Sequence, residues 1–113
     1  MVGKDCIFCK IASGEVPTKF ERETKNVMVF PDIKPSAQIH LLIVPKKHIA
    51  EFAAISKSDQ KIWQEMIDTA QDLIVRRKLA TKGYRLVTNG GPAAQVAHLH
   101  LHLLGGIGAK RKV

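Results

Sequence analysis

Polar and apolar residues alternate along residues 97–104, close to the end of the chain, until the final pair of leucines. The polar positions are His98, His100 and His102, and leucine occupies the positions between them. A period of two is typical of a β-strand, so we expect the three histidines on one face and the leucines on the other, packed in the core. Neighbouring histidines in such a row lie about 6–7 Å apart and the outer pair about 13 Å apart. All three would chelate one ion poorly, so separate roles are expected.

The same kind of pattern predicts four more strands and two helices. The strands are expected at residues 20–24, 27–30, 38–44 and 84–88. Apolar residues at a period of 3.6 predict one long helix, which begins near capping residues at 56–59 and ends at about Leu79. A short helix is expected over residues 5–13, capped by Asp5 and ended by Gly14. One long helix among short strands, without an alternating βαβ pattern, predicts an α+β fold with an antiparallel sheet.

Length, charge and composition narrow the choice of domains and partners. The 113 residues suffice for one domain, so we expect a single domain over residues 1–113 with a short basic tail from about residue 107. The formal net charge of +8 suits an anionic ligand such as a nucleotide phosphate. Nucleic acid is not expected as a partner, because the basic residues are scattered and aromatic residues, which stack on bases, make up only 5%.

Neither a membrane span nor a secretory leader is expected from the sequence. No apolar run reaches the roughly 18 residues that a membrane-spanning helix requires. The first residues, Met-Val-Gly-Lys-Asp, lack the apolar core of a signal peptide. The expected compartment is therefore the cytoplasm, with or without a nuclear fraction.

The histidine row at residues 98–104 reads His-Leu-His-Leu-His-Leu-Leu. It is similar to the signature of the histidine triad (HIT) family, in which three histidines alternate with hydrophobic residues. The similarity extends over about residues 5–106 and includes the motifs at residues 6–11, 30–33, 40–49 and 83–87. The Leu104-Gly105-Gly106 ending most resembles the histidine triad nucleotide-binding (HINT-like) branch, the nucleoside phosphoramidases. The resemblance implies a HIT-like fold, a mostly antiparallel five-stranded sheet with one long helix and a short N-terminal helix.

The resemblance implies an enzyme that cleaves purine nucleoside 5'-phosphoramidates, in which an amine is bonded to the phosphorus of a nucleotide such as AMP or GMP. His100 would be the nucleophile and would form a nucleotidyl-histidine that water hydrolyses. Its second ring nitrogen needs an acceptor to fix the tautomer, and we expect a backbone carbonyl in that role. No cofactor is expected for this chemistry. The alternatives are a dinucleoside polyphosphate hydrolase and a weakly catalytic nucleotide-binding interaction module.

The resemblance also implies which residues hold the nucleotide. They are Ile7, Phe8, Ile11, Phe30, Asp32, Ile33, Leu42, Asn89, Gln95, Val96 and His102, with His40 supporting the site from the adjacent strand. Asp32 would accept the ribose hydroxyls, while His102 and Asn89 would contact phosphate oxygens. Backbone amides near Gln95 would add further donors. Without the resemblance, Asp32 is better explained as a turn-capping residue and His40 as a buried core histidine.

The segment before the triad departs from the family pattern. Residues 94–97 read Ala-Gln-Val-Ala, where the nucleotide-binding branch has Gly-Gln-Ser/Glu/Thr-Val followed by a variable residue. The glycine is missing and the turn is at least one residue shorter. We therefore expect a different phosphate-loop geometry and altered protonation of the leaving group.

Cys6 and Cys9 form a Cys-x-x-Cys motif. A thioredoxin-type redox role is not expected, because the βαβ setting of that motif is absent. Two thiolates with two imidazoles would complete a tetrahedral structural zinc site. The resemblance to zinc-bearing triad proteins implies His48 and His98 as the two other ligands. The alternative is a pair of inert buried cysteines.

The long predicted helix carries an apolar stripe formed by Ile62, Trp63, Met66, Ile67, Ala70, Leu73 and Ile74. Such a stripe must cover one face of the sheet. In the proteins that this chain resembles, the helix also contacts its twin across a dimer. A homodimer is therefore expected, although the stripe alone fits either use.

Overall fold

The computed structural model describes residues 5–109, so the end of the expected basic tail, residues 110–113, lies outside the described part of the chain. The strands are β1 Arg22–Glu23, β2 Val27–Pro31, β3 Ile39–Pro45, β4 Tyr84–Val87 and β5 Leu101–Gly105. They form one antiparallel sheet in the order β1-β2-β3-β5-β4. The helices are α1 Ile7–Ala12, α2 Gln60–Arg76 and α3 Leu79–Lys82, with short 3-10 turns at Phe52–Ala54, Lys57–Asp59 and Gly91–Ala93. The predicted α+β fold with a five-stranded antiparallel sheet is confirmed.

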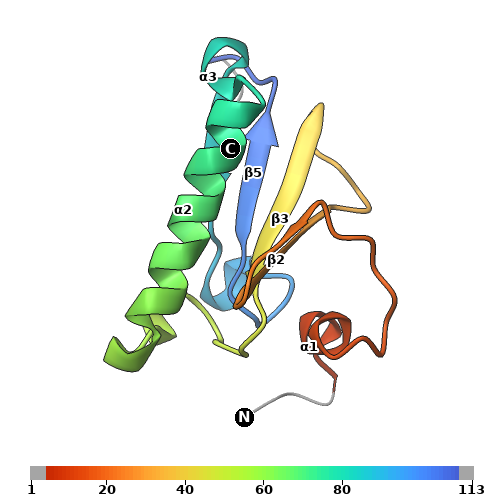
Figure 1. Ribbon diagram of the computed structural model, residues 1–113, viewed down its shortest axis with the longest axis vertical. Helices are drawn as coiled ribbons and strands as arrows, with labels where there is room; N and C mark the ends of the chain where they lie inside the picture. The colour runs from red at the N-terminus through yellow and green to blue at the C-terminus, as the bar shows by residue number, and fades with distance from the viewer. Residues whose placement is uncertain (1–4, 110–113) are drawn as a thin grey trace.

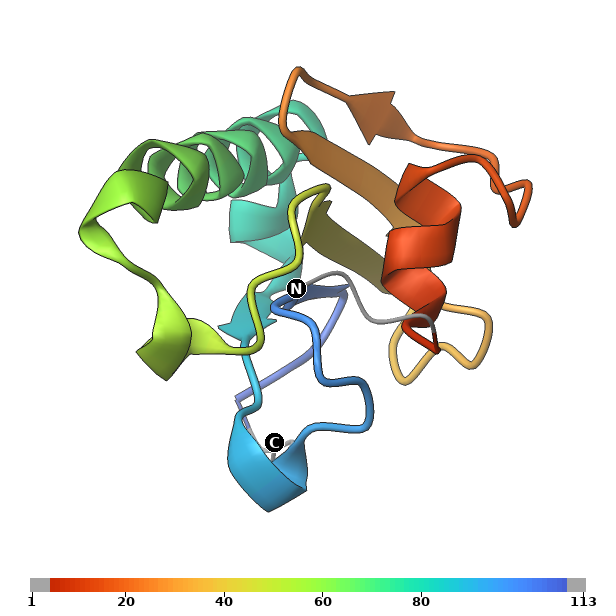
Figure 2. The same cartoon turned by 90° about the horizontal axis from the view of Figure 1, so that it is seen from below.

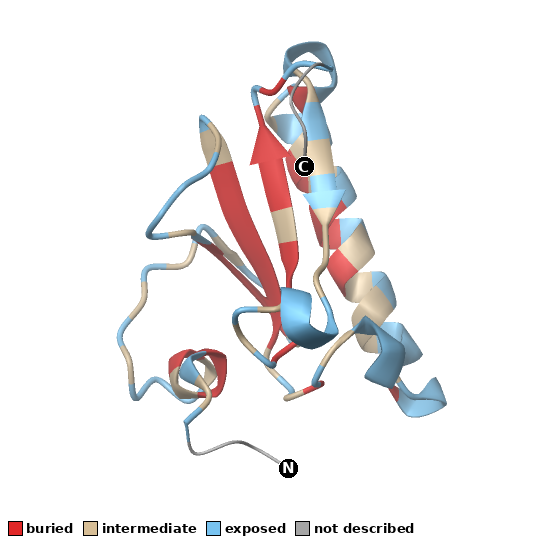
Figure 3. Cartoon of the chain, turned by 180° about the vertical axis from the view of Figure 1, so that it is seen from behind, coloured by how far each residue is buried: buried red, intermediate tan, exposed pale blue. Residues whose placement is uncertain are grey.

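Helices α1 and α2 lie on opposite sides of the sheet (Figures 1 and 2). The larger core lies between the sheet and α2, which contributes Met66, Ala70 and Leu73 at helical spacing. Leu99, Leu101, Leu103 and strand residues such as Ile43 fill the other side of this core. The outer face of α2 is exposed (Figure 3). The leucines of the triad segment therefore lie in the core, as the alternation predicts.

The opposite face of the sheet packs against α1. Its smaller core consists of Phe8, Ile11, Met28, Phe30, Leu42 and Val44. Residues of β2 and β3 alternate between the two cores, so both strands are apolar over nearly their whole length. Such strands are typical of a sheet that is covered on both faces. This second face carries the histidines.

The triad strand begins later than the alternation predicts. β5 starts at Leu101, so His98 and His100 precede the ladder. The register pairs Ile43 with Leu101, and two residues further the chain reaches Pro45, which has no N–H to donate. The amide of Leu99 instead donates to the carbonyl of Ile49, at 2.6 Å. The segment keeps its two faces although it is not paired as a strand.

The start of α1 and the end of α2 also differ from the prediction. The predicted cap at Asp5 is wrong: Cys6 is the N-cap of α1, and its Sγ accepts the amide of Cys9 at 3.3 Å. Gly14 follows the helix with a φ of +83°, in the left-handed region that glycine tolerates. Helix α2 ends at Arg76 rather than near Leu79, because Lys78 adopts a left-handed φ of 56°. The chain then resumes as α3.

The predicted caps at residues 56–59 do not bind the amides of α2. Asp59 occupies the N-cap position, but its side chain makes no capping hydrogen bond. Its carboxylate instead accepts from Lys47 Nζ at 2.6 Å and from Ser56 Oγ at 2.9 Å.

Among residues 5–109, none of the helices has the length and hydropathy that crossing a membrane requires.

Candidate functional site

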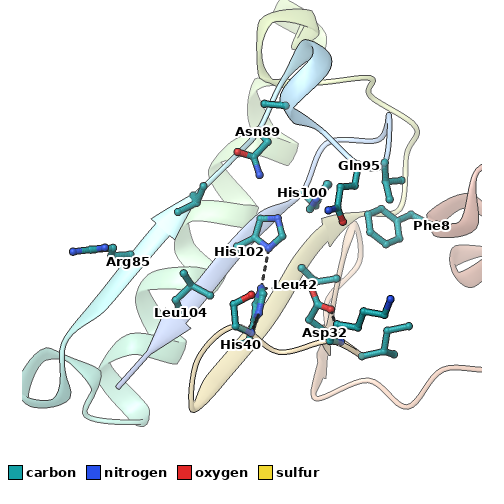
Figure 4. A pocket seen from close by; sticks show the side chains of 16 residues that line it. Phe8, Asp32, His40, Leu42, Arg85, Asn89, Gln95, His100, His102 and Leu104 are labelled. Carbon is teal, nitrogen blue, oxygen red and sulfur yellow. Dashed lines mark hydrogen bonds and ion pairs between the residues drawn. The ribbon is translucent and has the colours of Figure 1, made fainter. Parts of the chain in front are cut away.

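A cavity of about 800 Å³ opens on the sheet face that carries the histidines. It is lined by Phe8, Asp32, Ile33, Lys34, Ser36, His40, Leu42, Arg85, Val87, Asn89, Ala93, Gln95, Val96, His100, His102 and Leu104 (Figure 4). The floor comes from β3, β5 and β4. The walls come from α1, from the loop after β2 and from the segment between β4 and β5. The cavity therefore joins residues from the two ends of the chain, and residues 43–84 contribute none of its lining.

His100, the expected nucleophile, is 6% exposed and lines the cavity. Its Nδ1 lies 2.7 Å from the carbonyl oxygen of His98. Because a carbonyl only accepts, Nδ1 carries the proton and Nε2 keeps its lone pair. The ring of Phe8 packs edge-to-face on His100, with centroids 5.1 Å apart. The expected backbone acceptor is thus present, and it leaves a nitrogen that can attack an electrophile.

A chain of hydrogen bonds fixes the tautomers of His40 and His102. The amide of Ser36 donates to His40 Nδ1 at 2.9 Å, so a neutral His40 carries its proton on Nε2. That Nε2 lies 2.9 Å from Nδ1 of His102 and donates to it (Figure 4). The proton of a neutral His102 is therefore on Nε2. His102 is left as a hydrogen-bond donor beside His100, whose ring centroid lies 4.9 Å away.

Burial keeps His102 neutral at ordinary pH. The pKa of His102 is lowered to about 4, chiefly because burial disfavours the charged form. The neighbouring histidines His100 and His40 lower it further, while the carboxylate of Asp32 opposes them. A neutral His102 can therefore donate a hydrogen bond from Nε2. It does not take up a second proton at ordinary pH.

Asp32 makes the turn-capping contact, and its carboxylate also lines the cavity, where the ribose role stays a prediction. Its Oδ1 accepts the amide of Lys34 at 2.8 Å, which is a turn-capping contact. Its Oδ2 lies 3.5 Å from Nε2 of His40, at the cavity wall. Asn89 and Gln95 line the same cavity (Figure 4). The carboxylate is therefore held rigidly and can still accept hydroxyl groups of a ligand.

Three of the expected nucleotide-binding residues do not line the cavity. Ile11 and Phe30 are buried in the smaller core, and Ile7 is 41% exposed outside the cavity lining. Their spacing indicated an apolar wall, but only Phe8 of α1 reaches the cavity. The lining residues that the sequence did not indicate are Lys34, Ser36, Arg85, Val87, Ala93 and Leu104. Alternation along β4 could have indicated Arg85 and Val87, had the pairing with β5 been known.

The predicted metal ligands form a second cluster beside the cavity. Nδ1 of His98 lies 3.3 Å from Cys6 Sγ and 3.6 Å from Cys9 Sγ, and His48 Nδ1 lies 3.2 Å from Cys9 Sγ. The four ligand atoms all lie within 4.8 Å of one another. Sulfur and nitrogen ligands on a tetrahedral zinc would be about 3.5 Å apart.

The protonation of His98 also suits a metal. Its Nε2 lies 2.8 Å from the carbonyl of Pro45 and therefore carries the proton. Nδ1, which faces the two thiols, is left with a lone pair. Burial lowers the pKa of His98 to about 4, so this nitrogen is unprotonated. The donor set, its geometry and its tautomer fit a structural zinc ion.

A third group, Asp32, His40 and His102, is close enough to hold an ion but has the wrong protonation. The Ser36 amide already occupies Nδ1 of His40, so a neutral His40 has a proton on the nitrogen that would face the ion. Binding there would require either loss of that hydrogen bond or an imidazolate. The group is better explained as a hydrogen-bonded relay.

Comparison with known proteins agrees with the geometry. Residues 5–112 match the family described as scavenger mRNA decapping enzyme C-term binding. An uncharacterized HIT-like protein of Methanocaldococcus jannaschii is 38% identical over 88% of this chain and 77% of its own. The adenosine 5'-monophosphoramidase HINT3 of Mus musculus is 31% identical over 88% of this chain and 62% of its own.

A solved structure gives the same assignment. The HIT family hydrolase from Legionella pneumophila Philadelphia 1 has a TM-score of 0.86 and 43% identity, over 92% of this chain and 95% of that one. The histidine segment, the antiparallel sheet and these matches agree over nearly the whole sequence. The chain therefore belongs to the histidine triad family of nucleotide-binding hydrolases.

Proposed function

We propose that this protein hydrolyses purine nucleoside 5'-phosphoramidates through a nucleotidyl-histidine formed on His100. The observation that carries the proposal is the contact between His100 Nδ1 and the His98 carbonyl, which leaves Nε2 unprotonated in the cavity. The mouse relative described as an adenosine 5'-monophosphoramidase supports the choice of substrate. The apolar lining near Phe8 and Leu42 suits a purine base, and Asp32 suits a ribose.

The reaction has two displacements at phosphorus. In the first, the lone pair of His100 Nε2 forms a bond to phosphorus, the P–N bond breaks, and the leaving nitrogen keeps the electron pair and takes a proton from solvent. In the second, a water oxygen bonds to phosphorus, the bond to Nε2 breaks, and water releases a proton. The products are a nucleoside monophosphate and an amine. The Nδ1–H bond to the His98 carbonyl stabilises the charge that His100 acquires.

His102 stabilises the phosphoryl oxygens as their charge develops. Its Nε2–H is preset by the relay from Ser36 through His40, so no proton has to move before substrate binds. Asn89 lines the same part of the cavity and supplies an amide donor. Such donors act most strongly where water is excluded.

The test is turnover of an adenosine phosphoramidate by the wild-type protein and by His100→Ala, together with AMP titrations of both. We expect His100→Ala to lose several orders of magnitude in turnover while it still binds AMP. Near-normal turnover in the variant would refute the assignment of the nucleophile. AMP binding without turnover in the wild type would favour the interaction module, and preferred cleavage of a dinucleoside polyphosphate would favour the alternative hydrolase.

We also propose that the protein binds zinc and forms a homodimer. The cluster of Cys6, Cys9, His48 and His98 would hold one structural zinc per chain and would tie α1 to the sheet. Strand β4 is one of the two edge strands of the sheet, the other being β1. Tyr84 and Leu86 on β4 are 45% and 40% exposed, which supports a second copy at this edge. Light scattering after size exclusion, at several concentrations, tests the dimer, and a monomer throughout would refute it.

A further inference from the structure

Cys6 and Cys9 are the two cysteines of the chain, and their sulfurs lie close together without a disulfide between them. Both belong to the group of ligand atoms that lie within 4.8 Å of one another. Sγ of Cys6 accepts the amide of Cys9 at 3.3 Å, so this sulfur points toward residue 9. Thioredoxin closes a disulfide across the same Cys-x-x-Cys spacing. The pair can therefore form a disulfide without unwinding α1.

The two thiols differ in their access to solvent. Cys9 is 7% exposed, whereas Cys6 is only half-buried. Redox-sensitive cysteines are typically accessible to solvent and have a second cysteine beside them that resolves the oxidised form. The thioethers of Met28 and Met66 belong to residues that are fully buried. Within residues 5–109, Cys6 is therefore the sulfur that a small oxidant reaches most easily.

The cluster joins α1 to two other segments of the chain. His48 belongs to the loop after β3 and lies 3.2 Å from the sulfur of Cys9. His98 belongs to the segment before β5 and lies 3.3 Å from the sulfur of Cys6. A metal binds cysteine as the thiolate, and the sulfurs of a disulfide no longer have that charge. Oxidation of the two cysteines would therefore leave only the two imidazoles to hold a zinc ion.

We propose that Cys6 and Cys9 are a redox modification site, at which hydrogen peroxide forms a disulfide, releases the bound zinc and lowers turnover in the cavity. The proposal rests on the proposed zinc site and on the proposed hydrolase. It differs from a thioredoxin-type role, because the disulfide acts on its own chain and is not exchanged with another protein.

The oxidation removes two electrons from the pair of sulfurs. The thiolate of Cys6 attacks one peroxide oxygen, the O–O bond breaks, and the departing hydroxide takes a proton to form water, which leaves a sulfenic acid on Cys6. The thiolate of Cys9 then attacks the sulfur of Cys6, the S–O bond breaks, and a second hydroxide takes a proton to form water. Two thiolates, one peroxide and two protons thus give one disulfide and two water molecules.

Phe8 connects the cysteine pair to the cavity, because it lies between the two cysteines on α1. Its ring lines the cavity and packs on His100, with centroids 5.1 Å apart. Without the ion, α1 is held mainly by apolar packing in the smaller core, to which Ile11 and Phe30 contribute. The helix then stays on the sheet but holds the ring less firmly. Loss of one edge-to-face contact corresponds to about a two- to tenfold change in rate.

The experiment treats the zinc-loaded wild-type protein with hydrogen peroxide and follows the disulfide, the metal and the activity separately. Mass spectrometry after alkylation counts the free thiols, a chromogenic chelator reports released zinc, and an adenosine phosphoramidate reports turnover. We expect both thiols to be lost within one chain, about one zinc per chain to be released, and turnover to fall about two- to tenfold. A dithiol reductant with added zinc should restore all three values, because a disulfide is reversible by thiol exchange.

Cys6→His is the matched variant, because it keeps four possible zinc ligands and cannot form a disulfide within the chain. We expect it to keep its zinc during a peroxide treatment that oxidises the wild type completely. Loss of zinc from this variant as fast as from the wild type would overturn the proposal, since release would not require the disulfide. If the variant does not bind zinc, Cys6→Ser replaces it, and peroxide should lower its melting temperature less than that of the wild type.

The separate readouts distinguish failure of this proposal from failure of the proposed function. If the wild type shows no turnover, the hydrolase is refuted, and disulfide formation with zinc release and weaker AMP binding would still support the modification site. A disulfide that forms without zinc release, or complete oxidation that leaves turnover and AMP binding unchanged, would overturn the proposal. A disulfide between two chains, or sulfinic acid without a disulfide, would also overturn it. A wild-type protein that binds no zinc would refute the metal site and this proposal together.

Discussion

Phe8 connects the folding of α1 to the chemistry of the cavity, and its replacement tests that connection. The side chain is 5% exposed. Its ring contacts His98, His100 and Phe30 in edge-to-face pairs, with centroids 5.6, 5.1 and 5.9 Å away. Truncation of a buried phenylalanine to alanine costs about 3–5 kcal/mol. We expect Phe8→Ala to lose that amount in the free energy of unfolding, because α1 then keeps only Cys9 and Ile11 as buried residues.

Phe8→Leu is the matched variant, since it returns most of the apolar volume but not the ring edges. Each edge-to-face pair adds about 0.5–1.5 kcal/mol beyond its buried area. With non-additivity, we expect Phe8→Leu to remain about 1–2 kcal/mol below the wild type. Turnover of an adenosine phosphoramidate should fall in Phe8→Leu even where the protein is fully folded, because the ring no longer holds His100 from one side.

The assay is urea unfolding at constant zinc, followed by turnover of each folded variant. A loss below about 1 kcal/mol in Phe8→Ala would show that α1 contributes little to the fold, contrary to the packing described here. Equal losses in both variants would show that the ring edges, and not buried volume, stabilise the contact. Unchanged turnover in Phe8→Leu would refute the positioning of His100 by Phe8.

Three further predictions follow from the metal cluster, the relay and the shortened loop. Protein purified without chelator should carry about one zinc per chain, and Cys9→Ser should lower both the zinc content and the melting temperature, whereas elemental analysis without zinc would count against the site. The pKa of His102 is about 6.5 in the unfolded chain and about 4 in the folded protein. The unfolded state therefore binds more protons between these pH values, and the free energy of unfolding falls as the pH drops through this range. Allowing for partial exposure, we expect His102 to account for about 1 kcal/mol of the loss between pH 7 and pH 5, which His102→Gln should remove in urea titrations. Rebuilding residues 94–97 with the sequence Gly-Gln-Ser-Val should accelerate single turnovers about ten- to a hundredfold for substrates with basic leaving amines. The acceleration should be smaller for substrates with more acidic leaving amines. Equal acceleration of both kinds of substrate would exclude an effect on leaving-group protonation.

Local patterns predicted the faces of the elements, and the ends of β2, β3 and β4 to within one residue, but not the start of β5 or the ends of the helices. The alternation over residues 97–104 placed leucines in the core and histidines opposite them, because side-chain direction in an extended chain depends only on sequence parity. The start of β5 depends on Pro45, a residue of another strand that cannot extend the ladder. The cap of α1 is a thiol, that of Cys6, which accepts the amide of Cys9 in place of the expected carboxylate.

The cavity shows the same division between local and long-range information. His100 and His102 were predicted from their motif, and Asp32 from its resemblance to a family position. Arg85 was not predicted, because its place opposite Leu104 is set by a register between segments that are distant in the sequence. The proposed metal ligands could be named only through the family resemblance, because Cys6 and His98 are 92 positions apart and no spacing rule connects them.

The side chain and the main chain of His98 contact different parts of the site. Its imidazole faces the thiols of Cys6 and Cys9, while its carbonyl oxygen holds the proton of His100 in place. No substitution at position 98 can delete that carbonyl, so the tautomer of His100 is protected against point mutation and vulnerable only to displacement of the backbone. A zinc ion bound to the four proposed ligands would resist such displacement. Its loss would then reach Nε2 of His100, the proposed nucleophile, through one peptide group, without any change in the residues that line the cavity.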